Sequence, residues 1–369
     1  MDRVHPGVAQ ERDRSPEGGA LPSPRMKLGI NLGYFGTAIA GDTSVITDAE
    51  ALGYDSVWTA EAYGADALTP LAYLAGRTET IKLGAGIMQM PARTPAMTAM
   101  TAATIDRMSN GRFLLGLGVS GPQVVEGWHG RPYGKPLGVT REYVAIVRKA
   151  LARDEPVTFD GDYYQIPYTG DGATGLGKPL KLIAKPKNPD LPIYLASIGP
   201  KNVRLTAEIA DGWLPIFYSP ERADDIYGPL LAEGFELSGE PEKAKRFEIA
   251  ASVFAEVTDD LDRARLRAKP ILALYLGGMG AKGKNFYNDL AGRYGYEEAA
   301  QQVQDLYLDG KKMEATMAVP DDLVDELSLI GSKEQIADRL QAWQQAGVTT
   351  LILNTTDPKT LRAVAELVL

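Results

Sequence analysis

The chain has 369 residues, of which 44% are hydrophobic and 24% charged, proportions that are ordinary for a soluble globular protein with a sizeable core. Its net charge of −9 argues against a nucleic acid or an anionic membrane as the main partner. The absence of cysteine excludes disulfides, thiolate nucleophiles and cysteine-ligated metal centres, and the presence of only two histidines excludes a histidine-rich metal site.

Residues 1–25 are rich in proline, glycine and charge, and they lack the apolar stretch of a signal peptide. We therefore expect them to be a disordered tail or an upstream start, which would leave His5 outside the folded protein. No apolar run approaches the roughly 18–20 residues that a membrane helix needs. A cytoplasmic location without membrane contact is the expectation.

From Met26 onward, short apolar runs alternate with helical stretches, which is typical of parallel βα units. We predict strands at 27–33, 55–61, 81–88, 111–120, 191–197, 212–218, 247–258 and 348–355. Predicted helices separate them, among them 44–54, 68–77, 94–109, 140–153 and 201–211. Eight strands with intervening helices predict an α/β fold, a single (β/α)8 TIM barrel over residues 26–369, rather than an open doubly wound sheet.

Two stretches interrupt this alternation. Residues 155–190 contain a predicted hairpin around Asp160-Gly161, followed by a loop rich in glycine, proline and lysine. A mostly helical excursion runs from 259 to about 347, with an insertion near 275–320. We interpret both insertions as loops on the rims of the barrel and not as separate domains.

Active sites of such barrels lie at the C-terminal ends of the strands. Glu61 follows the second strand, where burial would raise its pKa and suit it to proton transfer, although a structural hydrogen bond across the barrel mouth is an equal alternative. His129 follows the fourth strand and is the second candidate proton donor, unless it is an incidental loop residue. Tyr63 is a candidate hydrogen-bond donor to the substrate.

An anion site is predicted after the fifth strand. A helix begins near Pro200, and its free N–H groups, together with Ser197, Gly199, Lys201 and Asn202, form a candidate phosphate cradle. The alternative is an ordinary strand–helix turn capped by Ser197. The preceding loop carries a lysine cluster that would either attract a polyanionic cofactor tail or form a solvated surface; it consists of Lys178, Lys181, Lys185 and Lys187.

The glycine-rich segment 116–121 lies inside a predicted strand and lacks the spacing of a dinucleotide fingerprint. We interpret its glycines as positions where a flat ring approaches the backbone. Aromatic residues near the strand ends predict an apolar mouth for a flat or hydrophobic small molecule. They are Tyr34, Phe35, Tyr63, Trp128, Tyr133, Phe217 and Tyr218.

Several segments, taken in this order, resemble the luciferase-like monooxygenase superfamily and its coenzyme F420-dependent branch. They are KLGINLGYFG, AEALGYDSVWTAEAYG, IKLGAGIMQMPARTP, DRMSNGRFLLGLGVSG, TREYVAIVRKAL, FDGDYYQIP, LPIYLASIGPKNVRLTAEIADGWLP and GSKEQIADRLQAWQQAGVTTLIL. The resemblance extends from about Met26 to the C-terminus. It is specific for the superfamily and less so for the cofactor, because FMN and F420 members share this layout.

The resemblance implies a barrel, often a homodimer, with the cofactor ring across its C-terminal mouth. Its phosphate site maps to Ser197, Gly199, Lys201 and Asn202, and a non-prolyl cis peptide that supports the ring maps to Gly86-Ile87. A bulge with all peptides trans is the alternative there, because glycines inside a strand often mark bulges. We also expect three further residues at the strand ends to line the cofactor site, namely Gly33, Tyr34 and Ser120.

Two departures from the family pattern limit what the resemblance implies. Several relatives carry a histidine directly after the second-strand acid, where this chain has Ala62, and sugar-phosphate dehydrogenases place a glutamate after strand four, where it has Ser120-Gly121. Their acid–base residues are therefore not carried over to this chain.

The leading hypothesis for the function is hydride transfer between F420 and a small organic substrate. An FMN-dependent monooxygenase and a non-catalytic flavin-binding barrel are the alternatives.

Overall fold

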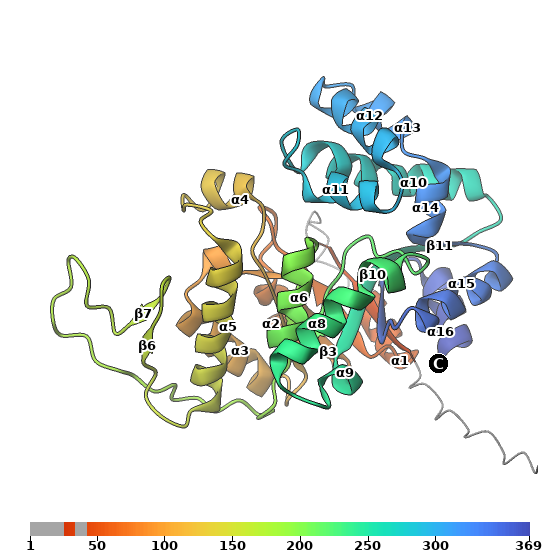
Figure 1. Cartoon of the computed structure of the whole chain (residues 1–369). Coiled ribbons are helices and arrows are strands. Elements are labelled where there is room, and N and C mark those ends of the chain that lie inside the picture. The colour runs from red at the N-terminus through yellow and green to blue at the C-terminus, as the bar shows by residue number, and fades with distance from the viewer. Residues whose placement is uncertain (1–25, 34–42) are drawn as a thin grey trace, which may run out of the picture.

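The structure, a computed structural model, describes residues 26–33 and 43–369, so the N-terminal tail, Tyr34 and Phe35 lie outside the described residues. Eight parallel strands form a closed barrel (Figure 1), because β1 pairs with both β2 and β12, and β10 pairs with both β9 and β12. The predicted (β/α)8 fold is confirmed. The strands are β1 (Lys27–Asn31), β2 (Ser56–Thr59), β3 (Lys82–Ala85), β5 (Phe113–Gly118), β8 (Ile193–Leu195), β9 (Gly212–Trp213), β10 (Glu248–Val257) and β12 (Thr350–Asn354).

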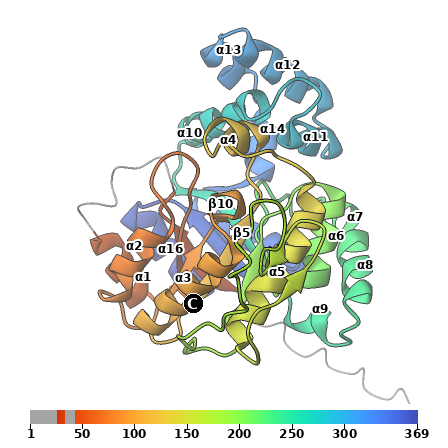
Figure 2. The same ribbon diagram turned by 90° about the vertical axis from the view of Figure 1, so that its left-hand side faces the viewer.

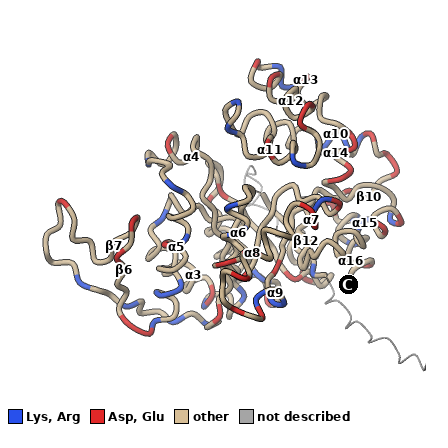
Figure 3. The backbone as a smooth tube through the Cα atoms, viewed as in Figure 1, with Lys and Arg blue, Asp and Glu red and all other residues tan. Residues whose placement is uncertain are grey.

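Helices cover the outside of the barrel (Figures 1 and 2). Their apolar faces pack on the strands, and their exposed faces carry charges of both signs side by side (Figure 3). They are α1 (Ser44–Ala51), α2 (Leu68–Ala75), α3 (Pro95–Met108), α5 (Pro136–Ala152), α6 (Pro200–Ile209), α7 (Ala223–Ile226), α8 (Gly228–Ser238), α9 (Lys243–Arg246), α15 (Lys333–Gln345) and α16 (Pro358–Val368). No helix within the described residues is long and apolar enough to cross a membrane.

A tryptophan fills the interior of the barrel. Trp58 packs edge-on against Tyr194, with ring centroids 5.6 Å apart, and its Nε1 donates to Ser56 Oγ at 2.9 Å. The Trp58 ring occupies the space next to Gly84: a Cβ atom added to Gly84 would lie 2.3 Å from the ring. Glycine at this position of β3 therefore makes room for the side chain of the neighbouring strand.

The third predicted strand is interrupted. It divides into β3 and β4 (Met88–Gln89), which pairs with β5, and the peptide bond Gly86-Ile87 between them is cis. The prediction of a non-prolyl cis peptide at this position is confirmed. The change of direction places Gln89 and the residues after it at the C-terminal end of the barrel, beside the end of β2.

The two interrupting stretches have different structures. The antiparallel pair β6 (Phe159–Asp160) and β7 (Gln165–Ile166) lies beside α5, where the Glu142 carboxylate accepts three backbone N–H groups of residues 162–164. After β10, a group of helices extends above the C-terminal end of the barrel, the same end as α4 (Pro122–Gly127) (Figures 1 and 2). The group consists of α10 (Leu261–Ala273), the π-helical turn η3 (Leu274–Gly278), α11 (Phe286–Arg293), α12 (Glu297–Leu308), α13 (Lys312–Met317) and α14 (Asp321–Glu326). A short strand that the sequence did not predict, β11 (Ser328–Gly331), pairs with the end of β10.

Candidate active site

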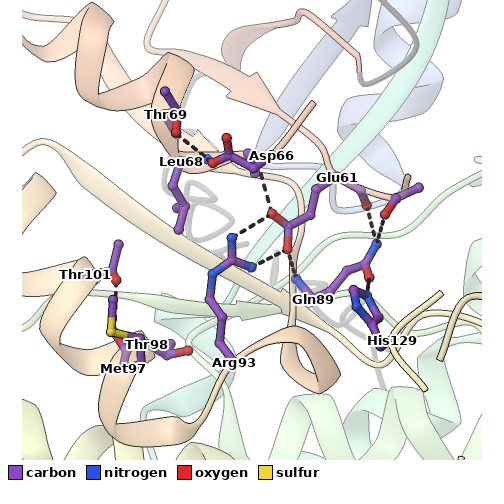
Figure 4. Close-up of polar contacts among 12 residues, drawn as sticks. Glu61, Asp66, Leu68, Thr69, Gln89, Arg93, Met97, Thr98, Thr101 and His129 are labelled. Carbon is purple, nitrogen blue, oxygen red and sulfur yellow. Dashed lines mark hydrogen bonds and ion pairs between the residues drawn. The ribbon is translucent and has the colours of Figure 1, made fainter. Parts of the chain in front are cut away.

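Glu61 lies at the C-terminal end of β2 in a saturated polar network (Figure 4). Its side chain is only 7% exposed and forms a bidentate ion pair with Arg93, at 2.5 and 3.2 Å. The same carboxylate accepts the backbone N–H of Gln89 at 2.7 Å and that of Ala67 at 3.1 Å. The two oxygens thus receive four hydrogen bonds, which fix the loops after β2 and β4 to each other.

Local sequence explains how Arg93 reaches this carboxylate. Pro91 lies in the short 3₁₀ turn η2 (Met90–Ala92), which directly follows β4. Gln89 before this turn and Arg93 after it both bond to Glu61. Asp66 closes the other side of the loop by accepting the N–H groups of Leu68 and Thr69 in the first turn of α2, at 2.9 and 2.8 Å.

The amide of Gln89 connects this network to His129. Gln89 is 1% exposed, and its Nε2 donates to the carbonyl oxygens of Glu61 and Ala62, at 2.9 and 3.1 Å. Its Oε1 is therefore the atom that faces His129 Nε2 at 2.6 Å, and since an amide oxygen only accepts, Nε2 carries the proton. In the neutral imidazole Nδ1 is then the atom able to accept a proton. Glu61, Gln89, Arg93 and His129 are called the Glu61 corner below.

The two glycines of β5, Gly116 and Gly118, make room for other parts of the barrel. Beside Gly116, an added Cβ would lie 1.9 Å from the carbonyl oxygen of Ala85. Beside Gly118, it would lie 2.4 Å from the side chain of Ile87. The space that a side chain would need at both positions is thus occupied by residues of the segment Ala85–Ile87, so glycine is required there for packing.

The segment between β8 and α6, residues 197–202, is called the Gly199 corner below. Gly199 is the residue before the first turn of α6, and an added Cβ there meets nothing within 4 Å. Lys201 is exposed, and Asn202 lines a small pocket together with Ser197. Pro200 has no N–H, and the N–H of Asn202 already donates to the carbonyl oxygen of Gly199 at 2.9 Å. The backbone donor that the first turn offers beside this open space is therefore the N–H of Lys201.

The hydroxyl of Ser197 is already bonded. Thr206 Oγ1 donates its only proton to the carbonyl oxygen of Asn202 at 2.8 Å, so in the 2.9 Å contact between Ser197 Oγ and Thr206 Oγ1 the serine is the donor. Ser197 Oγ can therefore accept, but its proton is directed toward α6.

Arg293, which sequence reasoning missed, reaches the same corner from α11. Its Nη2 donates to the carbonyl oxygen of Ile198 at 3.1 Å, while its buried Nη1 has no partner among the described residues. The two residues are 95 positions apart, so no local pattern could connect them.

The expectation that the lysines of 178–187 assist the phosphate site is wrong. The backbone N–H of Lys187 donates to Asp106 at 2.6 Å, and the carbonyl oxygen of Lys185 accepts from Arg107 at 3.1 Å. Both partners lie at the end of α3, just before β5 begins. A segment that leads into a strand lies at the N-terminal end of the barrel, opposite the Gly199 corner.

The predicted aromatic mouth is partly wrong. Tyr218 is 1% exposed and belongs to the core, where its hydroxyl donates to the carbonyl oxygen of Ala346 at 2.6 Å and its ring stacks on Tyr227. Burial raises the pKa of the Tyr218 phenol far above its ordinary value. Tyr63 and Trp128 are exposed, at 56% and 66%.

Further residues at the strand ends include some that sequence reasoning did not single out. Asn31 at the end of β1 donates to Asn354 at the end of β12 at 2.7 Å, and Asn31 Oδ1 also accepts the N–H of Gly33 at 2.9 Å. Ser120 and Phe217, which follow β5 and β9, have left-handed backbones with φ of 61° and 52°. A left-handed backbone is uncommon for residues other than glycine and often occurs at functional sites, so Ser120 and Phe217 are further candidates for the site at the barrel mouth.

Comparison with known proteins agrees with this architecture. A sequence profile of the family described as luciferase-like monooxygenase matches residues 31–350. A Mycobacterium tuberculosis protein, provisionally named a coenzyme F420-dependent oxidoreductase, is 47% identical over 344 residues, which cover 93% of this chain and 99% of that protein. A 5,10-methylenetetrahydromethanopterin reductase of Archaeoglobus fulgidus is 29% identical over 310 residues, which cover 82% of this chain and 86% of the reductase.

Solved structures show the same fold. The coenzyme F420-dependent tetrahydromethanopterin reductase of Methanopyrus kandleri superposes with a TM-score of 0.76 at 24% identity, covering 93% of this chain and 98% of the reductase. An F420-dependent secondary alcohol dehydrogenase in complex with an F420-acetone adduct superposes with a TM-score of 0.72 at 20% identity, with the same coverage. At such identities the likeness establishes the barrel and its connectivity.

Proposed function

Because the chain belongs to the luciferase-like monooxygenase family and is an oxidoreductase, we propose that it transfers a hydride between coenzyme F420 and a small organic substrate. The observation that carries the proposal is the relative named for F420, which is 47% identical over nearly the whole length of both chains. The structure supports it with features at the C-terminal mouth, where the cis peptide Gly86-Ile87 and the Gly199 corner occur in one barrel.

The residues at the mouth suit a cofactor with a phosphate group. Gly199 leaves open space at the start of α6, and Lys201 adds an exposed cation. Attraction of an anion has to be local, because the net charge of the chain is −9. The first turn of α6, with Lys201 and Asn202, would hold the phosphate, and Ile87 on the cis peptide would support the ring.

Bound F420 would supply hydride chemistry, and the protein would supply orientation and a proton. We assign the proton exchange to Nδ1 of His129, because Gln89 Oε1 already accepts from Nε2: Nδ1 accepts a proton in the neutral ring and donates it from the imidazolium. Tyr63, more than half exposed, remains a candidate donor to the substrate. The substrate is proposed to be apolar or aromatic, in line with the exposed Trp128 next to His129.

Glu61 is proposed to position residues and not to exchange protons. An acid–base group needs a free lone pair or proton toward the substrate, whereas this carboxylate already accepts from Arg93, Gln89 and Ala67. It would act through Gln89, whose backbone it binds and whose side chain orients His129.

Binding and oxygen consumption test the proposed function. The full-length protein is titrated with F420 and with FMN, and the cofactor that binds is then reduced and exposed to candidate carbonyl substrates with and without oxygen. We expect F420 to bind more tightly and its reoxidation by a substrate to consume no oxygen. Preferential binding of FMN, with oxygen uptake on reoxidation, would instead support the second candidate, an FMN-dependent monooxygenase, which the family description favours.

A homodimer is proposed as the assembly. Helix α3 exposes a row of methionines, Met97, Met100 and Met108, each about half accessible at 50%, 50% and 54%. The spacing places them along one side of the helix, which gives an apolar strip suited to burial. Light scattering should give twice the chain mass for the wild type, and Met100→Lys should shift it toward the monomer.

A further inference from the structure

A small pocket lies between the ends of β5 and β8 and the helices α5 and α6. Its apolar walls come mainly from the two strand ends. Its polar side chains are Thr140 of α5, Ser197 after β8, and Asn202 and Thr206 of α6. Ser197 and Asn202 belong to the Gly199 corner, so the pocket adjoins this corner on the side of α5, which sequence reasoning had not connected with the phosphate site.

One hydroxyl in this pocket has no partner. Thr140 is 5% exposed, and its Oγ1 is buried without a hydrogen-bond partner among the described residues. Threonines inside helices usually satisfy the hydroxyl by bonding to the carbonyl oxygen four residues earlier, as Thr101, Thr206 and Thr316 do here. A buried hydroxyl without a partner is costly, which points to a partner that is not part of the protein chain.

The neighbouring hydroxyls already have partners in this structure. Ser197 directs its proton to Thr206, and Thr206 directs its proton to Asn202. Thr140 is thus the hydroxyl of the pocket whose proton is free to reach a ligand.

The surroundings favour a negatively charged partner. The pocket borders the start of α6, where the first turn offers the N–H of Lys201 and the helix dipole favours an anion. Gly199 leaves the approach open, and Lys201 and Arg293 bring two cations to the same loop, Arg293 through its 3.1 Å bond to Ile198.

We infer that Thr140 donates a hydrogen bond to a phosphate oxygen of the bound cofactor, and that it, rather than Ser197, is the phosphate-binding hydroxyl of this site. The inference rests on the proposed function. A hydroxyl bond to a charged oxygen is stronger than one to a neutral group, so its loss should be measurable as affinity.

The test uses Thr140→Val, which removes the hydroxyl and keeps the shape, and Thr140→Ser, which keeps the hydroxyl. Thr316→Val is the matched control, because that hydroxyl is bonded within its own helix. Dissociation constants are measured by calorimetry for F420 and for the same deazaflavin with its ribityl chain but no phosphate. Melting temperatures are measured without cofactor.

Thr140→Val is expected to weaken F420 binding about tenfold or more and to leave binding of the phosphate-free deazaflavin unchanged. Without cofactor, the same variant should melt at the wild-type temperature or above it, because an unsatisfied hydroxyl has been removed. Thr140→Ser and Thr316→Val should bind F420 within about twofold of the wild type.

The inference is overturned if Thr140→Val binds F420 as tightly as the wild type or weakens both ligands equally. It is also overturned if the substitution only lowers the melting temperature, which would indicate an internal water as the partner. A wild-type protein that binds phosphate-free deazaflavin and F420 equally would overturn it as well. Failure of the wild type to bind F420 or FMN at all is a distinct result, which would reject the proposed function and with it this role of Thr140.

Discussion

The Glu61 corner and the Gly199 corner lie at the same end of one barrel, yet they differ in how far their polar groups are satisfied. At the Glu61 corner, the carboxylate receives four hydrogen bonds and the Gln89 amide makes three. At the Gly199 corner, Thr140 Oγ1 and Arg293 Nη1 have no partner within the described part of the chain, and the first turn of α6 begins in open space. A satisfied network fixes geometry, whereas an unsatisfied one is suited to binding, so we assign positioning to the first corner and cofactor binding to the second.

His129 is the residue through which the Glu61 corner should contact the reacting molecules. His129→Ala is expected to lower turnover by about 10²–10⁴, the usual contribution of a positioned acid or base, while F420 affinity stays within about twofold. Stopped-flow kinetics and calorimetry measure the two quantities. Gln89→Leu, which removes only the orienting partner, should lower turnover by less. A His129→Ala enzyme with normal turnover would remove His129 from the mechanism.

Replacing Glu61 should damage stability more than binding. Glu61→Ala leaves Arg93 largely buried without its anion, and we expect it to lower the free energy of unfolding by about 3 kcal/mol in urea denaturation. The double variant Glu61→Ala/Arg93→Met should recover part of this loss, because the unpaired charge is gone. The isosteric variant Glu61→Gln distinguishes a positioning role of Glu61 from an acid–base role. If it keeps full stability and F420 affinity but loses turnover 10²-fold or more, Glu61 is an acid–base catalyst after all.

Gly199→Val should act in the opposite way, on binding and not on stability. The backbone at Gly199 is extended and an added Cβ meets nothing within 4 Å, so the melting temperature without cofactor should not change. Affinity for F420 should fall about tenfold or more, because a side chain would block the approach to the Lys201 N–H in the first turn of α6. Gly76→Val at the end of α2, another open position, is the matched control and should bind normally. Unchanged affinity in Gly199→Val would place the phosphate elsewhere.

The smallest effect is expected from surface charge. Lys201→Ala should weaken F420 binding about threefold at low salt and less at physiological ionic strength, where the screening length is about 8 Å. Lys187→Ala, at the opposite end of the barrel, should have no effect on affinity. Equal effects of the two substitutions would indicate that the net charge of the chain, and not the Gly199 corner, sets the attraction.

The fold was largely predictable, since eight apolar runs separated by helical stretches suit few other architectures. The position of the cis peptide was predictable from the family resemblance. The short strand β11 was missed because four residues within a helical stretch give little periodic signal. Tyr218 was misplaced because β9 has only two residues, too few for alternation to show which side faces the core.

The site was predictable as a region but not as a set of contacts. The end of β2 and the start of α6 follow from the topology. The partners of their residues come from distant segments, since Arg93 is 32 positions from Glu61 and Arg293 is 95 from Ile198. The lysine cluster was assigned to the wrong end of the barrel. The topology could have prevented this error, because a loop before a strand lies at the opposite end of the barrel from a loop after it. The free hydroxyl of Thr140 depends on packing and leaves no mark in the sequence.

The central claim, that the Gly199 corner holds the cofactor phosphate, is tested most directly by a crystal structure of the full-length protein with bound F420. We predict phosphate density within about 3 Å of the backbone N–H of Lys201 at the start of α6, with Thr140 Oγ1 among its donors. Phosphate density elsewhere in the barrel mouth, with residues 197–202 in contact only with solvent, would contradict the claim.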